Sequence, residues 1–184
     1  HRVFGENRVQ EAAGKWPGFR EEFDGIDLHI IGPLQSNKVR QAMELADAIH
    51  SVDRPKIATT IARIADEIGS CPDLFIQVNT GEEDQKSGVL PDDLDTFLTE
   101  TCPNYDIKPV GLMCIPPMGK EPTPYFALLR TIAERNKLIA MLGGVLTVVL
   151  PLFLAANWIF TLPLCTHYNL PYGQAMQLST KLVS

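Results

Sequence analysis

Short apolar runs alternate with amphipathic stretches through residues 1–136, and this alternation restricts the fold more than any other feature of the chain. Four of the apolar runs are near-continuous, as strands buried on both faces of a parallel sheet are. We predict strands at residues 28–31, 48–52, 74–78 and 110–115, with Val3 and Phe4 as the remnant of another. The stretches between them predict helices at residues 7–15, 36–46, 54–68, 92–101 and 124–136. Strand and helix thus alternate as βα units, which build either a barrel or an open doubly wound sheet.

The stretch at residues 54–68 shows helical spacing most clearly. Its isoleucines recur at intervals of three and four, so that they form one stripe along a helix and are expected to pack on the sheet. No G-x-G-x-x-G motif follows any predicted strand, and the only glycine pair, Gly143-Gly144, lies far beyond them. This argues against a dinucleotide-binding sheet.

The balance of charge excludes a generic electrostatic partner such as nucleic acid. The formal net charge is −6, whereas phosphate binding needs a surplus of Lys and Arg on one face.

The four cysteines form no C-x-x-C pair and have no histidine at ligand spacing, so we predict neither a zinc site nor a redox motif. This use of cysteine fits a protein of the reducing cytosol, which is where we expect the chain to reside. The first residues lack the apolar core of a signal peptide, and the missing initiator Met predicts that an N-terminal piece is absent.

Polar residues follow each apolar run, at the positions where a parallel βα barrel holds its ligands. Glu6-Asn7 follows Val3-Phe4, and Gln35-Ser36-Asn37-Lys38 follows the next run. Asp53-Arg54 and Asn79-Thr80 follow the third and fourth runs, and Met113 to Pro116 closes the fifth. The carboxyl ends of the strands are therefore the first place to expect a site.

At these positions the sequence resembles the pyridoxal phosphate homeostasis family, a single-domain relative of the alanine racemase barrel. The matching segments come in order and cover roughly residues 3 to 135. They are Phe4-Gly5-Glu6-Asn7 with Val9-Gln10-Glu11, His29-Ile30-Ile31-Gly32-Pro33-Leu34-Gln35-Ser36-Asn37-Lys38, Ser51-Val52-Asp53-Arg54, Gln77-Val78-Asn79, Lys86-Ser87-Gly88 and Gly111-Leu112-Met113-Cys114-Ile115-Pro116.

The resemblance implies a barrel that carries pyridoxal phosphate as a Schiff base on a lysine and acts in cofactor and amino-acid homeostasis, not as a catalyst. Such an aldehyde cofactor needs an amine nucleophile, N–H donors for its phosphate and a polar partner for its pyridine nitrogen. The family's Schiff-base lysine lies on a strand upstream of the Phe4–Asn7 motif, outside this chain. The family's phosphate-binding segments would fall after Asn136, where the sequence reads Lys137-Leu138-Ile139-Ala140-Met141 and continues without an Arg.

We predict five residues as contacts of the cofactor, and each has a structural alternative. Asn7 faces the cofactor ring by resemblance, or else caps the following helix. Lys38 and Lys86 meet an anionic ligand or form a secondary imine, or else are solvated surface charges. His29 touches the ligand, or else is a partly buried histidine bonded to backbone. Met113 orients the cofactor, or else packs the barrel interior.

The charged residues end almost completely at Lys137, since only Lys181 follows it. Residues 138–164 carry no charge and are long enough to span a bilayer, which takes about 20 residues as a helix. Gly143-Gly144, Pro151 and Pro163 interrupt this run, and residues 145–150 fit a buried strand equally well. A third interpretation is that the tail is foreign to the barrel.

We therefore predict a partial parallel βα barrel of the TIM type, similar to the alanine racemase N-terminal domain, with an atypical apolar tail. Residues 1–136 form the pyridoxal phosphate-binding barrel and residues 137–184 the tail. The predicted function is cofactor binding and homeostasis by a monomeric cytoplasmic protein, without a metal or an identifiable catalytic set. Two alternatives stay open: a racemase-like enzyme that uses the same cofactor, and an interaction protein anchored in a membrane through residues 138–164.

Overall fold

The computed structural model describes residues 1–136. The predictions for residues 137–184, including the membrane span at residues 138–164, lie outside the described residues. Within residues 1–136 no helix combines the length and the hydropathy that crossing a bilayer requires.

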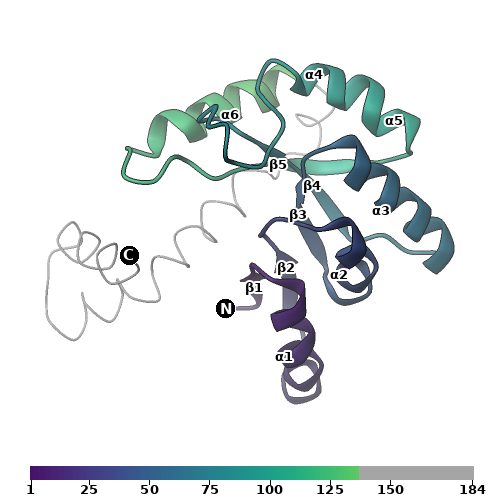
Figure 1. The fold of residues 1–184 in the computed structure, drawn as a ribbon. Helices are drawn as coiled ribbons and strands as arrows, with labels where there is room; N and C mark the ends of the chain where they lie inside the picture. The colour runs from purple at the N-terminus through teal and green to yellow at the C-terminus, as the bar shows by residue number, and fades with distance from the viewer. Residues whose placement is uncertain (137–184) are drawn as a thin grey trace, which may run out of the picture. The chain divides into compact units, whose positions relative to one another are not determined.

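Five parallel strands form one sheet in the order in which they follow along the chain (Figure 1). The strands are β1 (Val3–Glu6), β2 (Asp27–Ile30), β3 (Ala48–Val52), β4 (Asp73–Val78) and β5 (Pro109–Cys114). An open doubly wound sheet reverses its strand order at a switch point, whereas a barrel adds each strand beside the preceding one. The order β1-β2-β3-β4-β5 is thus that of a partial barrel, which decides the choice that the sequence pattern left open.

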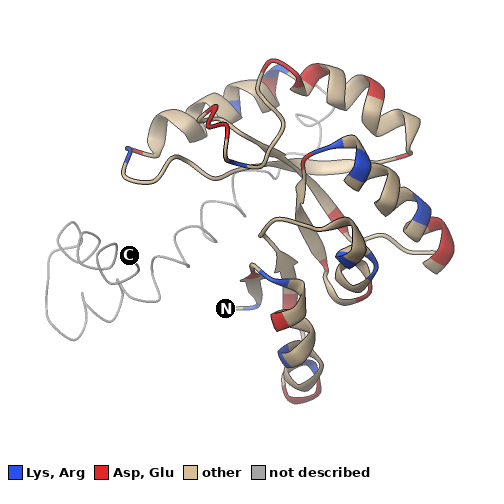
Figure 2. Cartoon of the chain, viewed as in Figure 1, with Lys and Arg blue, Asp and Glu red and all other residues tan. Residues whose placement is uncertain are grey.

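A helical segment follows each strand. These segments are α1 (Val9–Glu22), the 3₁₀ turn η1 (Ser36–Lys38) with α2 (Val39–Leu45), α3 (Pro55–Ile68), the run of α4 (Leu94–Thr96), η2 (Phe97–Thr101) and α5 (Cys102–Asn104), and α6 (Thr123–Arg135). Charged residues lie mainly along these helices and the loops, whereas the sheet is almost free of them (Figure 2). All five predicted βα units are therefore present.

Two predicted elements differ from the observed ones. The strand predicted as a remnant at Val3-Phe4 is complete through Glu6 and pairs with β2 over its whole length. The first helix continues past Pro17, beyond its predicted end, because Trp16 is buried and its ring packs against Phe4 at 5.9 Å. Tertiary packing of this aromatic pair outweighs the loss of one backbone N–H at the proline.

The fourth helical segment also differs from its prediction. It begins at Leu94, not at Asp92, and runs through to Asn104. Its middle, Phe97–Thr101, is wound as a π-helix, a geometry that no hydrophobic period predicts. Phe97 and Leu98 are nevertheless buried there, so the segment still covers the sheet.

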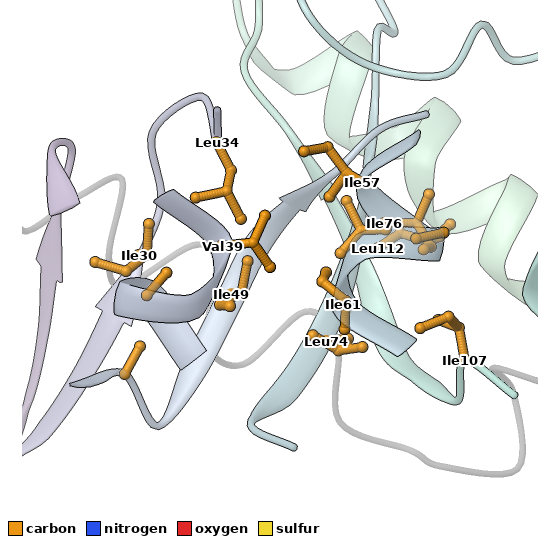
Figure 3. Packing of buried hydrophobic residues seen from close by; sticks show 14 of the residues in the cluster. Ile30, Leu34, Val39, Ile49, Ile57, Ile61, Leu74, Ile76, Ile107 and Leu112 are labelled. Atoms are coloured by element: carbon orange, nitrogen blue, oxygen red, sulfur yellow. The ribbon is translucent and has the colours of Figure 1, made fainter. Parts of the chain in front are cut away.

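The hydrophobic core lies between the sheet and the helices (Figure 3). Alternate strand residues face this side, and the isoleucine stripe of α3 covers them as predicted. The fully buried members include Leu28, Ile30, Ile49, Ile57, Ile61, Ile76 and Leu112. Each such side chain contributes about 1.5–3 kcal/mol when it leaves water. This packing holds the strands in register and so fixes where their carboxyl ends lie.

The intervening strand residues face the opposite side of the sheet, which we call the inner face. It carries Gly5 of β1, His29 of β2, His50 of β3, Phe75 and Gln77 of β4 and Met113 of β5, by the alternation of side chains along each strand. Polar and aromatic side chains are thus gathered where a barrel has its interior.

Candidate functional site

The carboxyl ends of the five parallel strands lie at one edge of the sheet, which we call the strand-end edge. It consists of the residues that follow each strand: Asn7, Gly32–Lys38, Asp53-Arg54, Asn79–Gly88 and Ile115–Pro117. This edge is the ligand side of a parallel βα barrel. Three of the predicted site residues, Asn7, Lys38 and Lys86, belong to it.

Asn7 and Gly32 fix the first two strand ends against each other. A Cβ atom on Gly32 would lie 2.1 Å from the carbonyl oxygen of Asn7, so that only glycine allows the two backbones to come this close. Asn7 itself is exposed, and Arg8, not Asn7, is the N-cap of α1. The capping alternative for Asn7 is therefore wrong, whereas its contact with a cofactor stays a prediction.

Arg54 joins the loop after β2 to the end of β3. Its guanidinium donates a hydrogen bond to the carbonyl of Leu34 at 2.9 Å and pairs with the carboxylate of Asp53. Burial raises the pKa of Asp53, and the neighbouring Arg54 charge opposes that rise. The pair thus keeps a carboxylate, only 5% exposed, at the strand-end edge.

Lys38 ends the short turn η1 between β2 and α2. Its side chain is half-buried, and within residues 1–136 it has no hydrogen-bond or ion-pair partner. Lys15, by contrast, pairs with Glu6 at 2.7 Å. Lys38 is therefore an amine that is both near the strand ends and uncommitted.

The loop after β4 folds back over the strand that it leaves. Val89 pairs with Val78, and the side-chain amide of Asn79 donates to the carbonyl of Glu83 at 2.9 Å. Gly88 has φ +127, and a Cβ there would lie 2.6 Å from the backbone nitrogen of Asn79. The loop conformation thus requires glycine at residue 88, because any other residue would be strained at this φ and its Cβ would clash with the backbone of Asn79.

Lys86 locks this loop to the next strand end. Its ammonium pairs with Glu83 at 2.7 Å and donates to the carbonyl of Pro116, after β5, at 3.1 Å. The side chains of Lys86 and Glu83 are 27% and 26% exposed. Lys86 therefore differs from the solvated surface charge that was its structural alternative, because the loop closes on itself and partly encloses the pair.

His29 and His50 form a direct contact on the inner face. Nδ1 of His29 lies 2.9 Å from Nε2 of His50, and the His50 ring stacks on Phe75 with centroids 4.1 Å apart. Burial lowers the pKa of His29, and burial together with the nearby His29 lowers the pKa of His50 to about 3. The predicted backbone partner of His29 is therefore wrong, since its partner is a second histidine.

Met113 and Gln77 lie beside each other on the inner face. They are register partners in the pairing of β4 with β5, and both are almost fully buried. The amide nitrogen of Gln77 donates to the carbonyl of Ser87, while Oε1 of Gln77 has no partner within the described residues. The expectation that Met113 packs the interior is confirmed, and its contact with a cofactor stays a prediction.

The five predicted site residues thus fall into two groups. Asn7, Lys38 and Lys86 lie at the strand-end edge, whereas His29 and Met113 lie on the inner face, on strands separated by β3 and β4. The sequence reasoning missed His50 as the partner of His29. A period of two along β2 and β3 places both histidines on one face, so the alternation could have found it. In the described part of the chain no group of three or more His, Cys, Asp or Glu could hold a metal.

Comparison with known proteins identifies the relatives of this arrangement. The family model of the alanine racemase N-terminal domain matches residues 1–146. Pyridoxal phosphate homeostasis proteins from Aquifex aeolicus and Vibrio cholerae are each 38% identical, over 136 and 143 residues. These matches cover 72% and 76% of this chain, but only 59% and 60% of the relatives. The chain thus spans about three fifths of the length of these relatives.

Solved structures support the same relationship. PipY of Synechococcus elongatus PCC7942 without PLP is 37% identical, with a TM-score of 0.66, over 79% of this chain and 67% of PipY. The structure of PipY with PLP bound has a TM-score of 0.62 and covers 79% of this chain and 77% of that one. An alanine racemase of Clostridium difficile, 12% identical with a TM-score of 0.56, shares the fold alone. The chain therefore belongs to the alanine racemase N-terminal domain family and, within it, to the pyridoxal phosphate homeostasis proteins.

Proposed function

We propose that this chain binds pyridoxal phosphate at the strand-end edge and serves cofactor homeostasis as a carrier or regulator. The observation that carries the proposal is the likeness to PipY, of which one structure has PLP bound. The names of the curated relatives favour a homeostasis role over a racemase, and the likeness to alanine racemase reaches the fold only.

The described residues fit several needs of this cofactor. Asn7 is exposed at the end of β1, where it can meet the polar edge of a ring. At the start of α3, Pro55 has no N–H and the N–H groups of Ile57 and Ala58 donate to the carbonyl of Arg54, so this helix end has the backbone N–H of Lys56 to offer a ligand. When bound, the cofactor would supply an aldehyde that reacts with amines. This chain would supply the amine and the polar surroundings.

Lys38 is the amine that we propose for the covalent contact. Its nitrogen has no partner in the described residues, whereas the nitrogen of Lys86 must leave both Glu83 and the carbonyl of Pro116 before it can attack an aldehyde. Lys38, once deprotonated, would hold the cofactor through its aldehyde with release of water, and borohydride reduction would make this linkage stable enough for peptide mapping.

Peptide mapping of the full chain after incubation with pyridoxal phosphate and borohydride tests the proposal. We expect one predominant adduct, on Lys38, which the Lys38→Met variant loses and the Lys120→Met variant keeps. Lys120 is exposed and serves as the matched control. Absence of any adduct, or equal labelling of many lysines, would contradict the proposal. A predominant adduct on Lys86 would support cofactor binding but reject the choice of lysine.

We also propose that residues 1–136 form the cofactor-binding unit and that residues 137–184 are a separate part of the chain. Comparison of the full chain with a version that ends at Asn136 tests this division. Equal binding by both versions is expected. If only the full chain needs detergent to stay in solution, the anchored interaction protein becomes the better account of the tail.

A further inference from the structure

The histidine pair on the inner face is a cluster of titratable groups that the proposed function does not use. His29 and His50 come from neighbouring strands and approach through one nitrogen each, at 2.9 Å. Only one proton fits between two nitrogens at that distance. While both rings are neutral, one ring donates this proton and the other accepts it, so a further proton can bind only at a nitrogen that faces away from the contact.

The two rings have different surroundings. His50 is 1% exposed and stacks nearly parallel on Phe75, at an interplanar angle of 10°. His29 is only partly buried. A charge on His50 would therefore lose almost all of its hydration, whereas a charge on His29 would keep part of it.

The charged groups around the pair also favour His29. Asp27 on its own strand, Asp47 before β3 and Asp73 at the start of β4 all stabilise a positive charge on it. Asp47 also accepts hydrogen bonds from Arg20 and the backbone of Leu28. Among the described residues, the one charged group that shifts the pKa of His50 is His29, which repels a second charge. The inner-face positions of the adjoining strands β1 and β4, within the described residues, include the uncharged Gly5, Phe75 and Gln77.

We propose that His29 and His50 form a one-proton acid switch, in which the pair binds a single proton at His29 in mild acid while His50 stays neutral. The inner face then gains one positive charge between neutral and mildly acidic pH. The contact between the rings persists in both states, because His29 keeps the proton that it donates to His50. Independent histidines would instead bind two protons.

Nuclear magnetic resonance of the imidazole rings in the full chain tests the switch between pH 7.5 and pH 4. Variants His1→Gln, His29→Gln, His50→Gln and His167→Gln assign the four rings. In the unmodified chain we expect the His29 ring to titrate below its ordinary value and the His50 ring to stay neutral at pH 4. In the His29→Gln variant the midpoint of His50 should rise, because the repelling charge is gone, but stay below 6.5 because of burial.

Proton uptake of the same proteins, measured by titration between pH 7.5 and pH 4, gives a second readout. The switch predicts that His50→Gln takes up the same number of protons as the unmodified chain, whereas independent histidines would lose one. His29→Gln should show a smaller deficit than one full proton, because His50, whose midpoint rises in that variant, takes up part of a proton by pH 4. Loss of one proton in each variant, or titration of both rings near 6.5, would overturn the proposal. Should a variant not fold at pH 7.5, by circular dichroism, the ring titrations of the unmodified chain still decide. The test is made without pyridoxal phosphate, so a failure of the proposed acid switch can be told apart from a failure of the proposed cofactor binding.

Discussion

The ring of His50 is only 1% exposed, and among the described residues no carboxylate contributes to its pKa shift. Its pKa is lowered to about 3 by burial and by His29, from 6.5 in an unfolded chain. Between these two values the unfolded chain binds a proton that the folded chain does not bind. The stability that the neutral ring allows is therefore present above pH 6.5 and is lost progressively as the pH falls toward 3.

Replacing His50 by Gln should flatten this pH dependence. The unfolding free energy of the unmodified chain should fall between pH 7 and pH 4 by about 2–3 kcal/mol more than that of the variant, since a tenfold change in proton affinity amounts to about 1.4 kcal/mol. Urea unfolding at several pH values measures the difference. His1→Gln, at an exposed position, is the control and should follow the unmodified chain. Parallel curves for His50→Gln and the unmodified chain would contradict the assignment of this ring as neutral and buried.

Lys86 offers a second prediction for a single residue. Lys86→Met removes both the pair with Glu83 and the hydrogen bond to the carbonyl of Pro116, and leaves Glu83 partly buried without its partner. We expect a loss of about 1–2 kcal/mol in unfolding free energy, together with faster proteolysis within the loop at residues 80–88. Lys108→Met removes only a pair in which both side chains are more than 80% exposed, so it should leave stability unchanged. Equal effects of the two substitutions would show that Lys86 does not lock the loop.

At the scale of elements, the strands could be predicted because burial on both faces leaves a direct trace in the sequence. Residues 48–52 read as one apolar run, and β3 has these bounds. The helix of residues 54–68 was equally plain from its isoleucine stripe. The end of α1 could not be predicted. Pro17 favours a helix that ends near it, whereas the packing of Trp16 on Phe4 of β1 stabilises a helix that continues, and this contact between two elements leaves no local pattern in the sequence.

In the candidate site, too, the positions of the residues could be predicted from the sequence, but their contacts could not. That polar residues follow each strand is visible in the sequence, and the topology alone brings them to one edge. The partners of these residues could not be predicted. Lys86 reaches a carbonyl thirty residues further along the chain, and Arg54 reaches back twenty residues to that of Leu34. Such contacts depend on how two loops meet, which no local pattern records.

The approach of β1 and β2 gives a prediction for a pair of elements. Gly32→Ala places a methyl group within 2.1 Å of the Asn7 carbonyl, so one of the two backbones must move, and we expect a loss of about 2–4 kcal/mol in unfolding free energy. Gly14→Ala is the matched control. It lies exposed in α1 with no atom within 4 Å of the new methyl group, and it should gain about 0.5–1 kcal/mol from helix propensity. Urea unfolding measures both changes, and tolerance of alanine at residue 32 would contradict the close approach.

At the scale of the whole molecule, the described residues contain five of the βα units that a closed barrel of eight would have. The relatives with which the chain shares its family extend over a longer sequence. In such barrels the loops after the last strands frequently hold a phosphate group. If residues 1–136 provide most of the binding surface, the affinity must come from the strand-end edge and from the covalent contact with a lysine. The contribution of the phosphate should be correspondingly small.

An equilibrium titration of the full chain with pyridoxal phosphate, and in parallel with pyridoxal, tests the central claim most directly. Absorbance of the cofactor follows the covalent contact, and dialysis counts the bound molecules. We predict saturation at one molecule per chain for pyridoxal phosphate, only modestly weaker saturation for pyridoxal, and loss of the covalent absorbance band in Lys38→Met but not in Lys120→Met. Uptake that rises linearly without saturation, and equally in both variants, would contradict a cofactor site at the strand-end edge.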